Sequence, residues 1–133
     1  MLFIDSKIDP DKLSLRLLAG LGDAVNSLIE RERAIIHTHS AKQMHNWTKE
    51  RVNAKAQAGN LERLRQFLTE KERNLIRRAT NLQTANYGKT GQLLARQATA
   101  YEILLGYLYL SNTARLQELI GLLDRQAQRP NGM

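Results

Sequence analysis

Apolar residues recur every three or four positions along most of the chain, which is the spacing of amphipathic α-helices. The first run consists of Leu17, Leu21, Val25 and Leu28. It predicts a helix that starts at Asp9–Asp11, where an acid precedes a proline at the first turn, and that extends to about Ile36. Glycines within Gly20–Gly22 mark a point where this helix could break.

The same period continues beyond a predicted connection at His37–His39. Ser40 can cap a second helix that passes through Trp47, Val52 and Ala56, with Gly59 near its end or in a short gap. A further helical stretch is indicated by Leu61, Leu64 and Leu68.

Capping signals predict three more elements. Thr69–Glu72 reads as a capping box that opens a helix to about Thr80. Residues 82–92 are glycine-containing and without period, so we expect a flexible loop there, followed by a helix over 93–110. Ser111 or Asn112 can cap a last helix, and residues 127–133 are expected to be a disordered tail. No alternating β pattern occurs, so the sequence predicts a single all-α domain with its core over about 10–125.

Composition supports a globular domain in a reducing compartment. The 133 residues are 42% hydrophobic and 25% charged, which suits one domain. The absence of cysteine excludes disulfides, thiolate zinc sites and a cysteine nucleophile. The longest apolar stretch, 103–110, is far shorter than the roughly 20 residues of a membrane span, and the N-terminus lacks an export pattern. We therefore expect a soluble, cytoplasmic protein.

Positive charge is concentrated in the middle of the chain. The net charge is +7. Residues 31–96 hold fourteen Lys or Arg and five Glu, whereas residues 1–30 carry a slight acidic excess. A basic segment of this kind attracts a polyanion, most commonly nucleic acid. A solvated helical surface explains the charge equally well at this stage.

Two carboxylates stand out because they interrupt apolar helical segments. Asp23 shares its predicted helix face with small and polar residues, and Glu102 shares its face with Ala98, Thr99 and Gly106. Small neighbours allow a second helix or a ligand to approach closely. Two such faces in contact would place both carboxylates in one cleft.

Such a cleft has the chemistry of a Mg²⁺ site. An isolated carboxylate near apolar groups is costly to ionise unless it is paired or binds a cation. Oxygen ligands without histidine or cysteine suit Mg²⁺, and metal ions support phosphodiester cleavage. Two alternatives stay open: Asp23 is a surface acid, or Glu102 pairs with Arg96 or another cation.

Three segments resemble the ribonuclease III domain family. LAGLGDAV around Asp23 is similar to the family's LGDAV signature, and ATAYEILLGYLYL around Glu102 is similar to its second motif. RVNAKAQAGNLERL, residues 51–64, resembles the middle helix of the same domain. Order, spacing and length match Mini-ribonuclease III, the short form without a double-stranded RNA-binding domain.

The resemblance implies a homodimeric, Mg²⁺-dependent endonuclease that cleaves double-stranded RNA and matures the large-subunit ribosomal RNA precursor. Carried onto this sequence, Asp23 and Glu102 take the catalytic and metal-binding positions. Three positions depart from the longer enzymes, at Ala19, Gly20 and Thr99, and Thr80 replaces an arginine in the basic run that is usual in the short form. Gly20 stands where those enzymes place an aromatic residue that packs into the partner subunit. Mini-ribonuclease III sequences share the substitutions of acids at 19 and 99.

Candidate RNA-binding residues follow from the same resemblance and from charge. They are Lys55, Gln57, Arg77, Arg78, Lys89 and Arg96. Lys55 and Gln57 match the middle helix and could touch phosphate or order the active site. The arginines and Lys89 flank the predicted 82–92 loop, which we expect to reach into an RNA groove. Two other hypotheses stay open: an inactive RNA- or ribosome-binding module of the same fold, and an unrelated helical regulator of DNA.

Overall fold

The computed structural model describes residues 3–5, 7–82 and 89–127, and every regular element within these ranges is helical. The elements are η1 (Pro10–Lys12), α1 (Leu15–His37), α2 (Ala41–Arg51), α3 (Ala54–Leu64), η2 (Arg65–Phe67), α4 (Glu70–Thr80), α5 (Lys89–Ser111) and α6 (Thr113–Ala127). The all-α prediction is therefore confirmed. No helix in the described ranges combines the length and the apolar character needed to cross a membrane.

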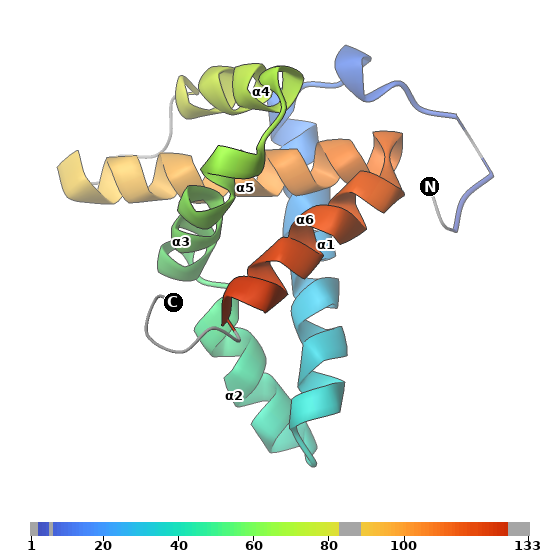
Figure 1. Cartoon of the computed structure of the whole chain (residues 1–133), viewed down its shortest axis with the longest axis vertical. Helices are drawn as coiled ribbons and strands as arrows, with labels where there is room; N and C mark the ends of the chain where they lie inside the picture. Colours follow the sequence, from blue (N-terminus) through green and yellow to red (C-terminus); the bar gives the residue numbers. More distant parts are fainter. Residues whose placement is uncertain (1–2, 6, 83–88, 128–133) are drawn as a thin grey trace.

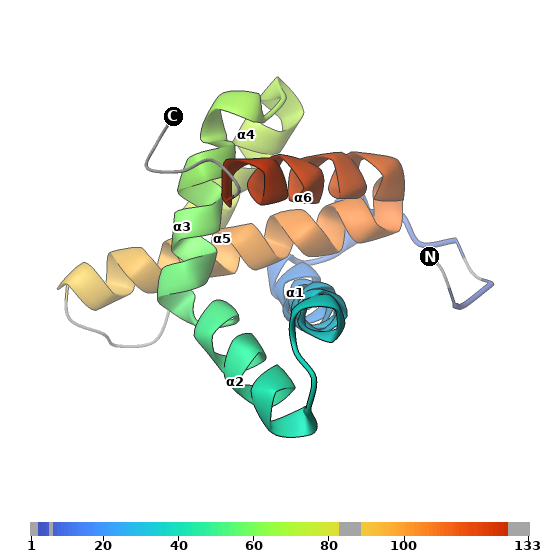
Figure 2. The same cartoon turned by 60° about the horizontal axis from the view of Figure 1, so that its bottom comes forward.

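Helix α5 organises the fold. Figures 1 and 2 show it running through the middle of the molecule, with α1, α3, α4 and α6 packed around it. Its apolar run is buried almost completely, and Ile103, Leu104 and Leu105 have no exposed surface. Side chains from the surrounding helices complete a single core, including Leu18, Leu61, Leu64, Leu75, Leu119 and Leu123. The hydrophobic effect therefore holds four helices to one central helix.

The first helix begins later than predicted and does not break. Asp9 caps only the short η1, and α1 starts after Ser14, whose hydroxyl accepts a hydrogen bond from the backbone N–H of Leu17. The helix then continues through Gly20–Gly22 to His37. Tertiary contacts on one side of α1 compensate for the weak helix propensity of glycine.

The buried face of α1 also differs from the predicted stripe. Leu18, Gly22 and Val25 face the core, whereas Leu17 and Leu28 are 63% and 45% exposed. The apolar run therefore lies only partly in the core: Val25 is buried, whereas Leu17 and Leu28 form an exposed apolar side of the helix. The real core face uses glycine to bring α5 close, and glycine carries no hydrophobic signal.

The second predicted helix is divided in two. Helix α2 ends at Arg51, and Asn53 caps α3 by accepting a hydrogen bond from the backbone N–H of Ala56 at 2.9 Å. Gly59 lies inside α3 instead of ending a helix. The break at Val52–Asn53 was missed because an asparagine side chain that caps a helix looks the same in sequence as one on a helix surface.

The last helices also differ at their ends. Helix α5 begins at Lys89, so the C-terminal part of the predicted 82–92 loop is helical, while residues 83–88 lie outside the described ranges. Asn112 caps α6 by accepting from the backbone N–H of Arg115 at 3.0 Å. Helix α6 includes Ala127, the first residue of the predicted tail, and residues 128–133 lie outside the described ranges.

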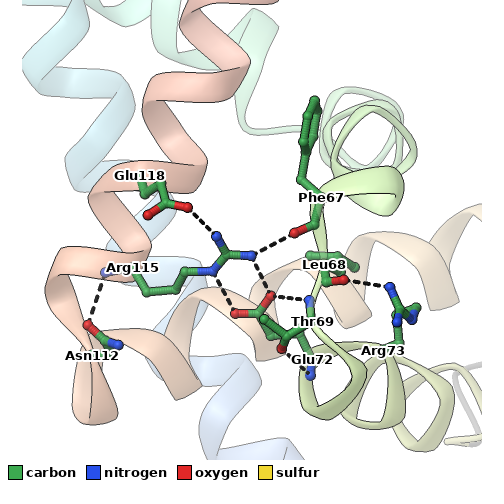
Figure 3. Close-up of polar contacts among 8 residues, drawn as sticks. All are labelled: Phe67, Leu68, Thr69, Glu72, Arg73, Asn112, Arg115 and Glu118. Carbon is green, nitrogen blue, oxygen red and sulfur yellow. Dashed lines mark hydrogen bonds and ion pairs between the residues drawn. The ribbon is translucent and has the colours of Figure 1, made fainter.

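The capping box of α4 is confirmed and is tied to α6 by an arginine (Figure 3). The Glu72 carboxylate accepts from the backbone N–H of Thr69, and the Arg115 guanidinium donates to both oxygens of Glu72 at 2.8–2.9 Å. Arg115 also donates to the carbonyl oxygen of Phe67 at 2.7 Å. Burial by itself raises the pKa of Glu72, but the hydrogen bonds from Arg115 and Thr69 outweigh it, so the pKa is lowered.

Candidate active site

Asp23 and Glu102 lie where α1 and α5 cross, and two glycines make that crossing close. A Cβ atom on Gly22 would lie 1.6 Å from the backbone oxygen of Glu102, and one on Gly106 would lie 2.2 Å from the backbone oxygen of Leu18. Only hydrogen fits at either position. The predicted role of small residues is therefore confirmed for Gly106, while Gly22 is an addition that the structure makes.

The crossing brings the two carboxyl groups together. Asp23 is exposed on α1, Glu102 is half-buried on α5, and the two carboxyl groups are close enough to share a hydrogen bond. Burial, the hydrogen bond with Asp23 and repulsion from the Asp23 carboxylate raise the pKa of Glu102 to about 8. The Glu102 carboxyl group is therefore mostly protonated at neutral pH when no cation is present.

The alternative in which a cation neutralises Glu102 does not hold within the described residues. No ion pair there involves Glu102, and the Nε atom of Arg96 is buried without a hydrogen-bond partner. The pKa of Glu102 is raised by the burial of its side chain and by the neighbouring Asp23 carboxyl group. A pair of acids that repel each other in a half-buried crossing is suited to a bound cation, which would stabilise both as carboxylates.

The donor set fits Mg²⁺ held by few protein ligands. No cluster of three or more His, Asp or Glu residues that could hold a metal occurs in the described ranges. Mg²⁺ is commonly bound by one or two carboxylates together with waters and substrate phosphates. Asp23 and Glu102 supply that number of carboxylates, and both are hard oxygen ligands.

Tyr101 fixes the part of α5 that carries Glu102. Its side chain is 1% exposed, and Asn60 of α3 is among the groups that act on its hydroxyl. Burial raises the pKa of Tyr101 to about 12, so the hydroxyl stays neutral. Because Tyr101 and Glu102 are neighbours on one helix, anchoring the tyrosine limits rotation of the glutamate.

The candidate RNA-binding residues on α3 have different environments. Lys55 is exposed and lines a cleft beside α1 and α6. Gln57 is 4% exposed, and its amide lies within hydrogen-bond distance of the Val52 carbonyl at 3.4 Å. Because Gln57 is buried, its side chain is better placed to order the active site than to touch a phosphate.

The basic residues Arg77 and Arg78 of α4 point to different sides of that helix. Arg77 lines a hollow with Arg65 and Arg73, whereas Arg78 lines another hollow with Asp11 and Tyr107. Arg96 is half-buried on α5, and Lys89 is the first residue of that helix, with its side chain outside the described part. The predicted cations whose side chains are described therefore occupy several faces and do not form one cluster.

Sequence reasoning missed two features of the site. Gly22 was not singled out, although a glycine next to a candidate catalytic acid is a signal for close approach. The depth at which Asn26 and Glu30 of the Asp23 face are buried was not predicted, since they are 1% and 2% exposed. Nothing local distinguishes a buried polar face from an exposed one, because both replace apolar residues with polar ones.

Comparison with known proteins places this all-helical domain in a family of nucleases. The family model "Ribonuclease III domain" matches residues 16–113. The chain therefore belongs to the ribonuclease III domain family, and it is an endoribonuclease-type hydrolase.

Its relatives include several proteins named Mini-ribonuclease 3. The protein of Thermosynechococcus vestitus is 37% identical over 106 residues, which is 80% of this chain and 70% of that protein. The protein of Kosmotoga olearia is 38% identical over 123 residues, covering 89% of this chain and 82% of its own. A crystal structure of protein FN1578 from Fusobacterium nucleatum superposes with a TM-score of 0.77 at 27% identity, covering 92% of this chain and 99% of that one. The resemblance to Mini-ribonuclease III is thereby confirmed.

Proposed function

We propose that the protein is a Mg²⁺-dependent endonuclease specific for double-stranded RNA. The observation that carries this proposal is the convergence of Asp23 and Glu102 at the α1–α5 crossing, with a pKa near 8 at Glu102. Named relatives at 34–38% identity support ribonuclease chemistry. We further propose the large-subunit ribosomal RNA precursor as substrate and the cytoplasm as the place of action.

Asp23 and Glu102 would hold the metal. Bound Mg²⁺ activates water and stabilises the charge that develops on the leaving oxygen. The exposed Asp23 faces solvent and is accessible to a phosphodiester, whereas the half-buried Glu102 is held by the packing of α5. The proton on Glu102 must leave before it can bind a cation, so metal binding releases protons.

Basic residues outside the carboxylate pair would position the duplex. Lys55, Arg77, Arg78, Lys89 and Arg96 are the candidates for phosphate contact, and Gln57 is a positioning residue. Each phosphate contact releases counterions, so binding should weaken steeply with salt. The logarithm of the binding constant should fall with the logarithm of the salt concentration by about 0.9 per phosphate contact.

We also propose a homodimer. The exposed side of α1 carries Leu17 and Leu28, and Gly20 is exposed with no atom within 4 Å of a Cβ position. An apolar stripe on the surface of a soluble domain marks an interaction face. A partner with the same stripe would cover it by two-fold symmetry.

The decisive experiment uses Asp23→Asn and Glu102→Gln. Both variants keep the shape of the side chain but remove a metal-binding charge. We expect cleavage of duplex RNA in Mg²⁺ to fall by at least about 10³-fold, corresponding to about 4 kcal/mol of transition-state stabilisation, while binding of the duplex persists.

Gel-based cleavage assays with duplex RNA, single-stranded RNA and duplex DNA measure activity and preference together. Full activity of both variants would contradict the metal assignment. Binding of structured RNA without products from the unmodified protein would favour the inactive-module hypothesis, and preference for duplex DNA would favour the regulator hypothesis.

A further inference from the structure

A charged cleft separate from the carboxylate pair opens between α1, the end of α2, α3 and the end of α6. Its volume is about 540 Å³, within the range of small-ligand sites, and neither Asp23 nor Glu102 lines it. The residues that line it fall into two walls of opposite character.

The α2–α3 wall is cationic. It presents Arg51, Lys55 and Arg63. The one acid on this wall, Glu50, approaches Arg51 at 3.5 Å and is 74% exposed, so it neutralises little of the charge. Arg63 donates to the Asn60 amide oxygen, and no carboxylate pairs with Lys55 or Arg63 in the part of the chain that the structure describes.

Arg51 is held in place before any ligand arrives. Its guanidinium lies 3.4 Å from the centroid of the Trp47 ring, and Nη1 donates to the Trp47 carbonyl oxygen at 3.2 Å. His37 stacks on the same ring with a centroid distance of 4.8 Å. A guanidinium fixed in this way loses little conformational freedom when it binds an anion.

The α1–α6 wall offers a buried acceptor. The Glu30 side chain is 3% exposed, and its Oε1 atom accepts from Arg33, which also reaches Asp124 at 2.6 Å. The Oε2 atom is buried and has no hydrogen-bond partner among the described residues. Since Arg33 already supplies a positive charge, this oxygen requires a neutral donor such as a hydroxyl group.

We propose that the cleft binds a phosphorylated ribose. The phosphate lies against Arg51, Lys55 and Arg63, and a ribose hydroxyl donates to Oε2 of Glu30. An anion next to a hydroxyl matches a cleft with one cationic wall and one acceptor wall. The ligand is either a free ribonucleotide or a nucleotide of an RNA strand. In the second case the site deepens the proposed function and rests on it, because a hydroxyl contact separates RNA from DNA.

Isothermal titration calorimetry of the full chain with ribose 5-phosphate, 2-deoxyribose 5-phosphate and inorganic phosphate tests the chemistry. We expect ribose 5-phosphate to bind at least ~10-fold more tightly than the other two, the loss expected for one buried hydrogen bond left unmade. No binding, or equal binding of all three probes, would overturn the proposal.

Variants locate the site. Arg63→Gln and Glu30→Gln should each weaken binding of ribose 5-phosphate by at least ~10-fold, whereas Arg125→Gln, on the exposed side of α6, should leave it unchanged. Circular dichroism checks that Glu30→Gln folds, and Arg63→Gln tests the cationic wall if it does not. Unchanged binding by Arg63→Gln would place the ligand elsewhere and overturn the assignment.

Two further measurements identify the source of the ligand and separate this proposal from the proposed nuclease function. Displacement of ribose 5-phosphate by duplex RNA assigns the cleft to an RNA strand, and displacement by a ribonucleoside monophosphate alone assigns it to a free nucleotide. Asp23→Asn should keep ribose 5-phosphate binding, because Asp23 does not line the cleft. A cleaving protein that fails to bind the probe would refute this inference alone.

Discussion

The close crossing of α1 and α5 requires glycine at position 22, because no side chain larger than hydrogen fits there. At Gly22 a methyl group would collide with the backbone of Glu102, whereas at Gly20, two residues earlier in the same helix, it would meet nothing within 4 Å. The two glycines therefore form a matched pair with opposite expected effects.

We predict that Gly22→Ala destabilises the protein by about 3 kcal/mol or more, because the helices must separate. Gly20→Ala should stabilise it by about 0.5–1 kcal/mol through helix propensity. Urea unfolding followed by circular dichroism measures both changes. Equal effects of the two substitutions would show that the crossing is looser than the structure indicates.

Glu102 makes stability depend on pH. Its pKa is about 8 in the folded protein and about 4.3 in an unfolded chain. Between these values the folded state holds a proton that the unfolded state has released, so stability falls as pH rises through this window.

We predict that Glu102→Gln removes this dependence. In the presence of a chelator, the unfolding temperature of the unmodified protein should fall relative to that of the variant between about pH 4 and pH 8. Below about pH 4 the unfolding temperatures of the two proteins should change with pH in the same way. Mg²⁺ should restore part of the loss at pH 8, since a cation replaces the proton. Parallel profiles over the whole range would contradict the raised pKa.

At the scale of elements, Arg115 joins α6 to the start of α4. It is the counter-charge of the buried Glu72, whose carboxylate also completes the capping box with Thr69 (Figure 3). One carboxylate thus serves a local and a long-range role, which couples formation of α4 to docking of α6.

We predict that Arg115→Met destabilises the protein by about 3 kcal/mol, because it leaves the Glu72 charge buried and unpaired. Arg115→Met combined with Glu72→Gln should recover part of the loss, since the amide keeps an acceptor for the Thr69 N–H without a charge. Chemical denaturation of the single and double variants forms a double-mutant cycle. Additive effects would show that the pair contributes nothing.

At the scale of the whole molecule, the exposed apolar side of α1 predicts self-association. Leu28→Glu should convert a dimer to a monomer, because it places a charge in the proposed interface. Leu93→Glu, at a 59% exposed leucine of α5 away from the stripe, is the matched control and should leave the assembly unchanged. Sedimentation velocity measures both, and a monomeric unmodified protein would contradict the dimer.

The family resemblance and the helical content could be predicted because they rest on local signals. Ser40, Thr69 and Asn112 act as the caps that their residue types and positions indicate. The errors lie where tertiary contacts decide: the continuity of α1 through Gly20–Gly22, and the helix break at Asn53. A local pattern carries no information on which distant backbone packs against it.

Local sequence pattern was enough to predict an all-helical chain and to mark Asp23 and Glu102 as candidate site acids. The fold alone brings the two carboxyl groups together, since the 78 intervening residues, 24–101, impose no local geometry on them. It also decided which side of α1 is buried, since Gly22 and Gly106 allow a contact between backbones that larger side chains would prevent. The second cleft likewise arises only in the folded chain, where Glu30 and Arg63 from separate helices face one cavity.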